Sequence, residues 1–202
     1  MQARKLAVAV IVAVAVLLII SPGLADKKTA EKSNPVVLME TTLGPIKIEL
    51  SHEKAPITAE NFLRYVDEGF YDGTAFHRVI KGFMVQGGGL TADMERKKTH
   101  QPIKNEASPQ LKNDRGTIAM ARTAEIHSAT SQFFINLVDN TFLNQRDKTA
   151  RGYGYCVFGR VTECMDVVDK IGTVKTTTRG PYKDVPVTPV IIKTVRRVHA
   201  PQ

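Results

Sequence analysis

One arginine in this sequence lies in an apolar segment that has no acidic partner close by. Arg78 belongs to "FHRVIKGFMVQGGG", residues 76–89, and the next acidic residue toward the C-terminus is Asp93. Apolar strands usually exclude arginine or pair it with an acid. A fixed positive charge beside Phe83 and Met84 therefore indicates a site where a charged N–H donor faces an apolar surface.

The common catalytic and metal-binding motifs do not fit around this arginine. "GFMVQGGG" has the glycine spacing of a phosphate-binding loop, but Gly88 and Gly89 replace its Lys and Ser or Thr. "HEKAP" begins like a zinc-protease motif, but Pro56 replaces the second histidine, and the five histidines are dispersed. No serine lies in a GxSxG sequence, and no carboxylate pair has an apolar context. We therefore predict a site without a nucleophile, an acid–base pair or a metal. Its polar members are Arg78, Gln86 and Gln132, amid Phe83, Met84, Phe133, Phe134 and Phe142.

The segments around these residues predict a mainly β protein. Residues 36–51 alternate between apolar and polar side chains around a Gly-Pro turn, whereas "APITAENFLRYVDEGF" has the helical period. Short strands are then predicted at "AFHRVI", "FMVQGG", "GTIAMA", "SQFFINL" and "YCVFGRVT", followed by a helix, "CMDVVDKIG", and a last strand, "VIIKTVRRV". Many short strands with two isolated helices favour one barrel or sandwich with helical caps.

The N-terminus has the layout of a secretory signal peptide. Two basic residues precede an apolar run at 6–20, and Ser-Pro-Gly and small residues follow it. Fifteen apolar residues reach roughly 22 Å as a helix, which is short of the ~30 Å hydrocarbon core of a membrane. We predict cleavage after Ala25, with an uncleaved membrane anchor or a buried helix as alternatives. A flexible leader at 26–35 then precedes one domain at 36–198.

The charge and the cysteine content bear on two further questions, whether the protein binds nucleic acid and whether it contains a disulfide. Loss of residues 1–25 removes two positive charges, so the net charge of +8 becomes +6. The basic residues are scattered, and no stacking aromatics accompany them, so we predict solvated surface charge and no nucleic-acid partner. Cys156 and Cys164 are eight residues apart on a predicted strand that runs into a helix. An extended segment of that length keeps the two cysteines too far apart for a disulfide. We therefore predict two free thiols.

Five segments together resemble the cyclophilins, in order and at suitable spacing, over about residues 36–198. They are "FHRVIKGFMVQGG", "GTIAMAR", "SQFFINL", Phe142-Leu143 and "YCVFGRV". The stretches "ARTAEIHSATSQFFIN" and "GYGYCVFGRV" look most like periplasmic cyclophilins of Gram-negative bacteria, which agrees with the predicted signal peptide. The resemblance implies a closed eight-stranded antiparallel barrel capped by helices at 58–67 and 165–171.

The resemblance also implies the activity and the partners. It implies a peptidyl-prolyl cis-trans isomerase that needs no cofactor and acts on unfolded or partly folded polypeptides that contain proline. The protein would be a periplasmic monomer that meets the membrane only during export. A non-catalytic proline-peptide binding module or a holdase is the alternative, but the charge of Arg78 together with Gln86 favours the enzyme.

The family's site residues can be carried over by motif. Arg78 and Gln86 would be catalytic, with Arg78 as the donor to the twisted amide and Gln86 holding both the arginine and the substrate carbonyl. The substrate-binding residues would be Phe83, Met84, Ala121, Arg122, Gln132, Phe134, Phe142, Leu143 and Tyr155. Phe133 is assigned to the core because the family places Phe134 in the pocket, and His77 is given a structural role.

Three of these positions depart from the commonest family pattern. Phe142 stands where many members carry Trp, Tyr155 where many carry His, and Arg122 where many carry Asn. The segment 144–154, "NQRDKTARGYG", is also longer than in compact members. These departures concern the rim of the pocket and the binding of cyclosporin, and they leave the arginine in place.

Overall fold

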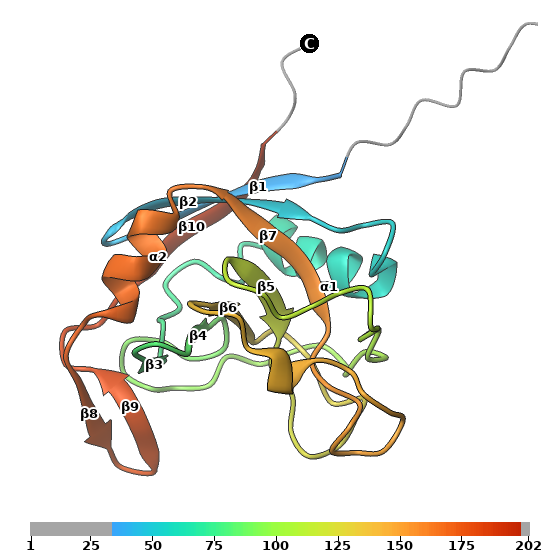
Figure 1. Cartoon of the computed structure of the whole chain (residues 1–202). Coiled ribbons are helices and arrows are strands. Elements are labelled where there is room, and N and C mark those ends of the chain that lie inside the picture. The colour runs from blue at the N-terminus through green and yellow to red at the C-terminus, as the bar shows by residue number, and fades with distance from the viewer. Residues whose placement is uncertain (1–33, 199–202) are drawn as a thin grey trace, which may run out of the picture. The chain divides into compact units, whose positions relative to one another are not determined.

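The structure is a computed structural model of the chain, and it describes residues 34–198 (Figure 1). The predicted signal peptide at 1–25 and leader residues 26–33 lie outside the described residues. None of the helices in the described part is long and apolar enough to cross a membrane.

Eight strands form one antiparallel sheet in the order β10-β1-β2-β7-β5-β6-β4-β3. The strands are β1 (Val36–Thr41), β2 (Gly44–Leu50), β3 (Arg78–Ile80), β4 (Met84–Gly87), β5 (Thr117–Met120), β6 (Phe133–Asn136), β7 (Val157–Glu163) and β10 (Ile192–Val198). Each predicted strand segment thus contributes to the sheet. Burial alternates along both β1 and β2, and in β2 it follows the apolar–polar alternation of the sequence, with Ile46 and Ile48 buried and Lys47 partly exposed.

The prediction of a closed barrel is wrong, because the sheet is open between β10 and β3. At this seam the residues before β3 meet the start of β10. Ala75 and Ile191 form an isolated bridge, Phe76 N donates to Val190 O at 2.9 Å, and Ile192 N donates to Thr74 O at 2.8 Å. Pro186 and Pro189 precede β10 and have no N–H to donate, so a ladder cannot continue there. β3 itself has only three residues.

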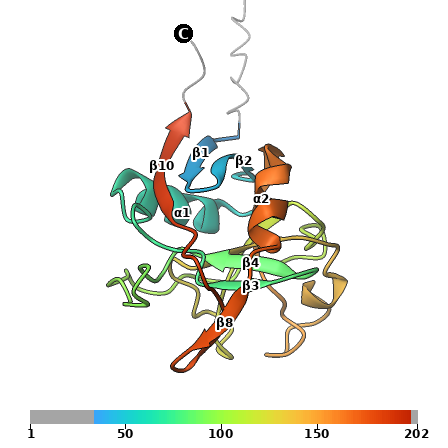
Figure 2. The same ribbon diagram turned by 90° about the vertical axis from the view of Figure 1, so that its left-hand side faces the viewer.

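The two predicted helices are present, and Figures 1 and 2 show them at opposite ends of the curved sheet. α1 (Pro56–Asp67) begins with a proline, whose fixed φ suits the first turn of a helix. Its buried face includes Phe62 and Val66. α2 (Met165–Gly172) buries three apolar side chains, those of Val167, Val168 and Ile171. Both helices therefore exist because an apolar stripe can be covered by the sheet.

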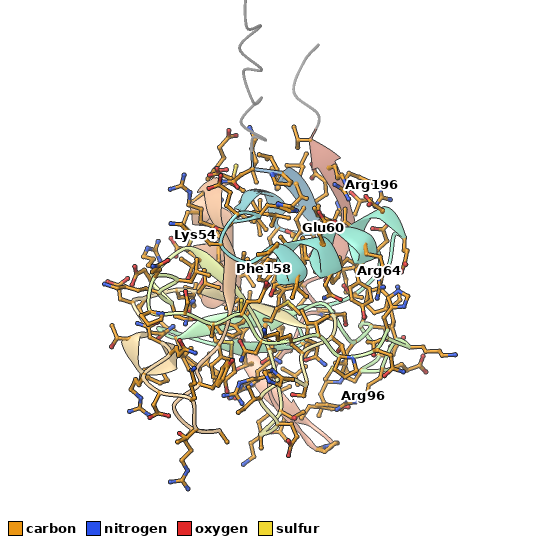
Figure 3. All side chains as sticks on the ribbon, turned by 90° about the vertical axis from the view of Figure 1, so that its right-hand side faces the viewer. Lys54, Glu60, Arg64, Arg96, Phe158 and Arg196 are labelled. Carbon is orange, nitrogen blue, oxygen red and sulfur yellow. The ribbon has the colours of Figure 1, made fainter. Side chains whose placement is uncertain are left out.

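A cluster of aromatic rings fills the core beneath α1. The ring of Phe62 lies 5.2 Å from that of Phe158 and 5.8 Å from that of Phe133, the latter edge-on. Figure 3 shows Phe158 beside α1. Phe133 is fully buried in this cluster, and its neighbour Phe134 faces the opposite side of the strand, as alternation along β6 requires.

A second, two-stranded sheet was not predicted. β8 (Thr176–Arg179) and β9 (Tyr182–Pro186) form a hairpin, and β9 lies next to β3 (Figures 1 and 2). Its sequence, "TTTRGPYKDVP", is polar and lacks alternation, and all four residues of β8 are exposed. The hairpin is attached instead through β9, where Val185 is buried.

Candidate active site

The β3–β4 pair places the predicted catalytic residues side by side. Arg78 of β3 is the register partner of Gln86 of β4, and Gln86 is in turn opposite Phe134 of β6. Directly opposed residues of antiparallel strands project from the same face. An arginine, an amide and an aromatic ring are therefore brought to one face of the sheet from three strands.

These side chains enclose a small pocket of about 190 Å³. Nine of the predicted site residues line it: Arg78, Phe83, Met84, Gln86, Ala121, Arg122, Phe134, Leu143 and Tyr155. Met84, Phe134 and Leu143 are buried and supply apolar surface. Sites for drug-sized ligands usually measure about 300–1,000 Å³. A pocket of this size suits one apolar side chain or ring of a larger ligand.

Gln132 and Phe142 do not line this pocket. Gln132 accepts a hydrogen bond from Gln86 Nε2 at 3.0 Å and lies in a neighbouring groove. Phe142 belongs to the 3-10 helix η1 (Thr141–Leu143) and is 66% exposed. Its ring stacks on that of Phe83 at 5.6 Å. Phe142 thus stands at the outer rim, where it supports Phe83.

Two of the departures from the family pattern contact each other. The guanidinium of Arg122 lies 4.9 Å from the centre of the Tyr155 ring, and that ring meets Phe134 edge-on at 5.6 Å. Arg122 also donates from Nε to Gly154 O and from Nη2 to Ala150 O, both at 3.0 Å. Arg122 therefore ties the long 144–154 segment to one wall of the pocket.

Arg78 has an acidic partner that sequence reasoning missed. Its Nε lies 3.6 Å from Asp184 Oδ2, and the two side chains are 44% and 41% exposed. Asp184 comes from the unpredicted β8–β9 hairpin, so no local signal pointed to it. Gln86, which was expected to hold Arg78, donates to Gln132 instead.

A second groove, of about 410 Å³, lies on the other side of Arg78. It shares Arg78 and Gln86 with the pocket and is completed by His77, Arg96, Gln132 and the hairpin residues 181–184. His77 is buried, and its burial lowers the pKa of its imidazole from 6.5 to about 4. A neutral histidine behind the arginine agrees with the structural role assigned to it.

A larger groove, of about 980 Å³, runs along α1, away from Arg78. Figure 3 shows two of its lining residues, Glu60 and Arg64, on the exposed side of the helix. It is rimmed by polar contacts, such as the hydrogen bond between His52 Nε2 and Glu60 Oε1 at 2.6 Å. It is wider and more open to solvent than the smaller pocket.

Residues 34–198 show no feature that favours catalysis by a metal ion or by a cysteine thiol. The described part contains no group of three His, Cys, Asp or Glu side chains that could hold a metal ion. Cys156 and Cys164 are both free, as predicted, and burial raises the pKa of Cys156 to about 11. A thiol with so high a pKa is a poor nucleophile at neutral pH.

Comparison with known proteins identifies the family. The model of the cyclophilin type peptidyl-prolyl cis-trans isomerases matches residues 36–197. The chain is 49% identical to peptidyl-prolyl cis-trans isomerase A of Dickeya dadantii, over 95% of this chain and 97% of that protein. It is 56% identical to peptidyl-prolyl cis-trans isomerase B of Escherichia coli, over 79% and 98% of the two chains.

A solved structure agrees with these matches. A cyclophilin of Cryptosporidium parvum, crystallised in the presence of the dipeptide Ala-Pro, superposes with a TM-score of 0.67 at 27% identity, over 82% of this chain and 99% of that one. The fold, the family model and the relatives agree, and so the chain belongs to the cyclophilin family and is a peptidyl-prolyl cis-trans isomerase.

Proposed function

We propose that the protein accelerates X–Pro isomerisation by using Arg78 to stabilise the twisted amide. The observation that carries this proposal is a fixed charge at the edge of a small apolar pocket. Rotation about the X–Pro bond is slow because the amide must lose resonance, and the barrier of a peptide bond is ~18–20 kcal/mol. In the twisted state the proline nitrogen is pyramidal, and its lone pair can accept a hydrogen bond.

A donor at that nitrogen binds the twisted state better than either planar isomer, and such differential binding is catalysis. Arg78 suits this role because a guanidinium stays charged and has a rigid set of N–H groups. The proline ring would lie against Phe83, Met84, Phe134 and Leu143, whose apolar surfaces exclude water and strengthen the field of the arginine. A hundred-thousandfold acceleration corresponds to about 7 kcal/mol.

The polar neighbours would hold the substrate backbone. The Gln86–Gln132 hydrogen bond fixes the Gln86 side chain beside the pocket. The N–H of Ala121 donates to Gln132 O at 2.9 Å, so the Ala121 carbonyl is the group left for a peptide N–H. These groups would align a proline-containing peptide across the pocket. The Ala-Pro dipeptide with which the Cryptosporidium relative was crystallised supports a ligand of this class.

Magnetisation-exchange NMR on a short Ala-Pro peptide tests the activity of this chain. We expect exchange between the cis and trans signals to become measurable with a catalytic amount of residues 26–202. A non-catalytic binding module or holdase gives the opposite pattern, with peptide signals that shift or broaden while the exchange rate stays at its uncatalysed value.

We also propose that the protein is exported and acts as a monomer on folding chains in the periplasm. The layout of residues 1–25 supports this, and the match with the Dickeya protein covers 95% of this chain and so takes in part of that segment. After expression in a Gram-negative host, the periplasmic protein should begin at Asp26 by mass spectrometry. A membrane fraction that retains residues 1–25 would contradict cleavage.

A further inference from the structure

We propose that Asp184, on the β8–β9 hairpin, is a positioning residue that aims the guanidinium of Arg78 into the proline pocket. The inference rests on the proposed function of Arg78 and extends it to the hairpin. Among residues 34–198, Asp184 is the one side chain with which the Arg78 guanidinium forms an ion pair or a hydrogen bond, at 3.6 Å from Nε to Oδ2.

Arg78 needs such a partner because little else restrains it. It begins β3, the three-residue strand at the open edge of the sheet, and its side chain is 44% exposed. Arginine has among the largest rotamer freedoms of all side chains. Without a partner the guanidinium would sample directions away from the pocket, and a misplaced catalytic group loses much of its effect.

The position of Asp184 determines which way the Arg78 guanidinium points. Arg78 lines both the proline pocket and the neighbouring groove, whereas Asp184 lines only the groove. The carboxylate therefore contacts the guanidinium from the side opposite to the pocket. The contact uses Nε and leaves the two terminal nitrogens, which carry four of the five N–H groups, available for a substrate.

The hairpin presents this carboxylate through an unusual backbone conformation. Asp184 has φ of 59°, in the left-handed region, between exposed Lys183 and buried Val185. Asp, Asn and Gly tolerate this region well, whereas Ala does not. The conformation allows a matched pair of variants, because Asp184→Asn keeps the side-chain shape and Asp184→Gly removes the side chain, yet both keep the backbone.

In the activity assay we expect both variants to lower kcat by about twofold to fivefold, the range that corresponds to the measured strengths of exposed ion pairs. KM should not change, because Asp184 does not line the proline pocket. Asp166→Asn is the control: it removes an exposed carboxylate that pairs with Lys170 on α2, at 2.9 Å, and should leave kcat unchanged. In an Arg78→Ala background, Asp184→Asn should cause no further loss.

A second measurement tests how firmly the Arg78 side chain is held, without any substrate. ¹⁵N relaxation of the arginine Nε–H groups should show Arg78 restrained in the wild type and clearly more mobile in both Asp184 variants. Arg115, which pairs through both terminal nitrogens with Asp169 at 2.9 and 2.7 Å, is the internal reference and should not change.

The two measurements separate the inference from the function on which it rests. A more mobile Arg78 together with a lower kcat supports the inference. If Arg78→Ala itself keeps the wild-type rate, the proposed function of Arg78 fails, whereas a more mobile Arg78 in the variants still establishes the contact. Unchanged relaxation of Arg78 in both Asp184→Asn and Asp184→Gly would overturn the inference.

Discussion

Arg78 Nε and Asp184 Oδ2 lie 3.6 Å apart, although 106 positions separate the two residues in the sequence. The contact joins the first residue of an edge strand to a hairpin that closes no part of the main sheet. Folding thus brings Asp184 next to an arginine that has no acidic neighbour in the sequence, and it does so on the side away from the pocket. This arrangement places an opposite charge beside the guanidinium while its terminal N–H groups stay available.

The isomerisation rate should be nearly flat between about pH 6 and 9. Arg78 is charged throughout this range, and Gln86 and Gln132 do not ionise. His77, the nearest histidine in sequence, is neutral there because burial lowers its pKa to about 4. Exchange NMR at several pH values checks this expectation, and a bell-shaped profile would reveal an acid or base at the site.

The same buried histidine should make the fold sensitive to acid. Its pKa is about 4 in the native state and 6.5 when unfolded, so between these values the unfolded chain binds more protons than the native one. Stability is therefore complete above pH 6.5 and is lost as the pH falls toward 4. For this one group we expect a loss of about 2 kcal/mol between pH 7 and pH 5.

Urea unfolding at the two pH values measures this loss. The variant His77→Gln cannot titrate, and its free energy of unfolding should change much less between pH 7 and pH 5, whatever its absolute stability. An equal loss in the wild type and in His77→Gln would show that other groups cause the acid sensitivity.

Cyclosporin should inhibit the native protein weakly. The resemblance places Phe142 where many cyclophilins carry Trp, and a phenyl ring has no N–H to donate. The lost hydrogen bond is worth about 1–3 kcal/mol, which corresponds to roughly tenfold to hundredfold in affinity. Phe142 is 66% exposed at the rim, so Phe142→Trp can be accommodated and should tighten inhibition with little change in turnover. Tight inhibition of the unmodified protein would contradict this role of Phe142.

Much of the site could be predicted because its residues lie in compact motifs. The β3–β4 segment carries Arg78, Phe83, Met84 and Gln86 within nine residues. In a hairpin of that length the register nearly fixes where these four residues lie relative to one another. The helices followed from their apolar periodicity, which tertiary packing against the sheet reinforces.

The features that escaped prediction depend on contacts between distant residues. The sheet stays open between β3, which has only three residues, and β10, which follows Pro186 and Pro189. The apolar periodicity of single strands does not show whether the two edges of a sheet pair with each other. The β8–β9 hairpin is polar and is attached to the fold mainly through Val185. Because that hairpin was not predicted, its contact between Asp184 and Arg78 could not be predicted either.

The proposed role of Arg78 is tested most directly by the exchange rate that the variant Arg78→Ala catalyses. Arg78 lies half-exposed at an edge strand, outside the apolar core, so the variant should keep the wild-type midpoint of thermal unfolding to within a few degrees. Arg78→Lys serves as the matched control, because it keeps the charge but loses the rigid fork of donors.

Magnetisation-exchange NMR should show kcat/KM reduced by about a hundredfold or more in Arg78→Ala, the usual effect of removing a transition-state donor. Arg78→Lys should lie between Arg78→Ala and the wild type. A folded Arg78→Ala variant that exchanges the Ala-Pro peptide at the wild-type rate would contradict the proposed mechanism.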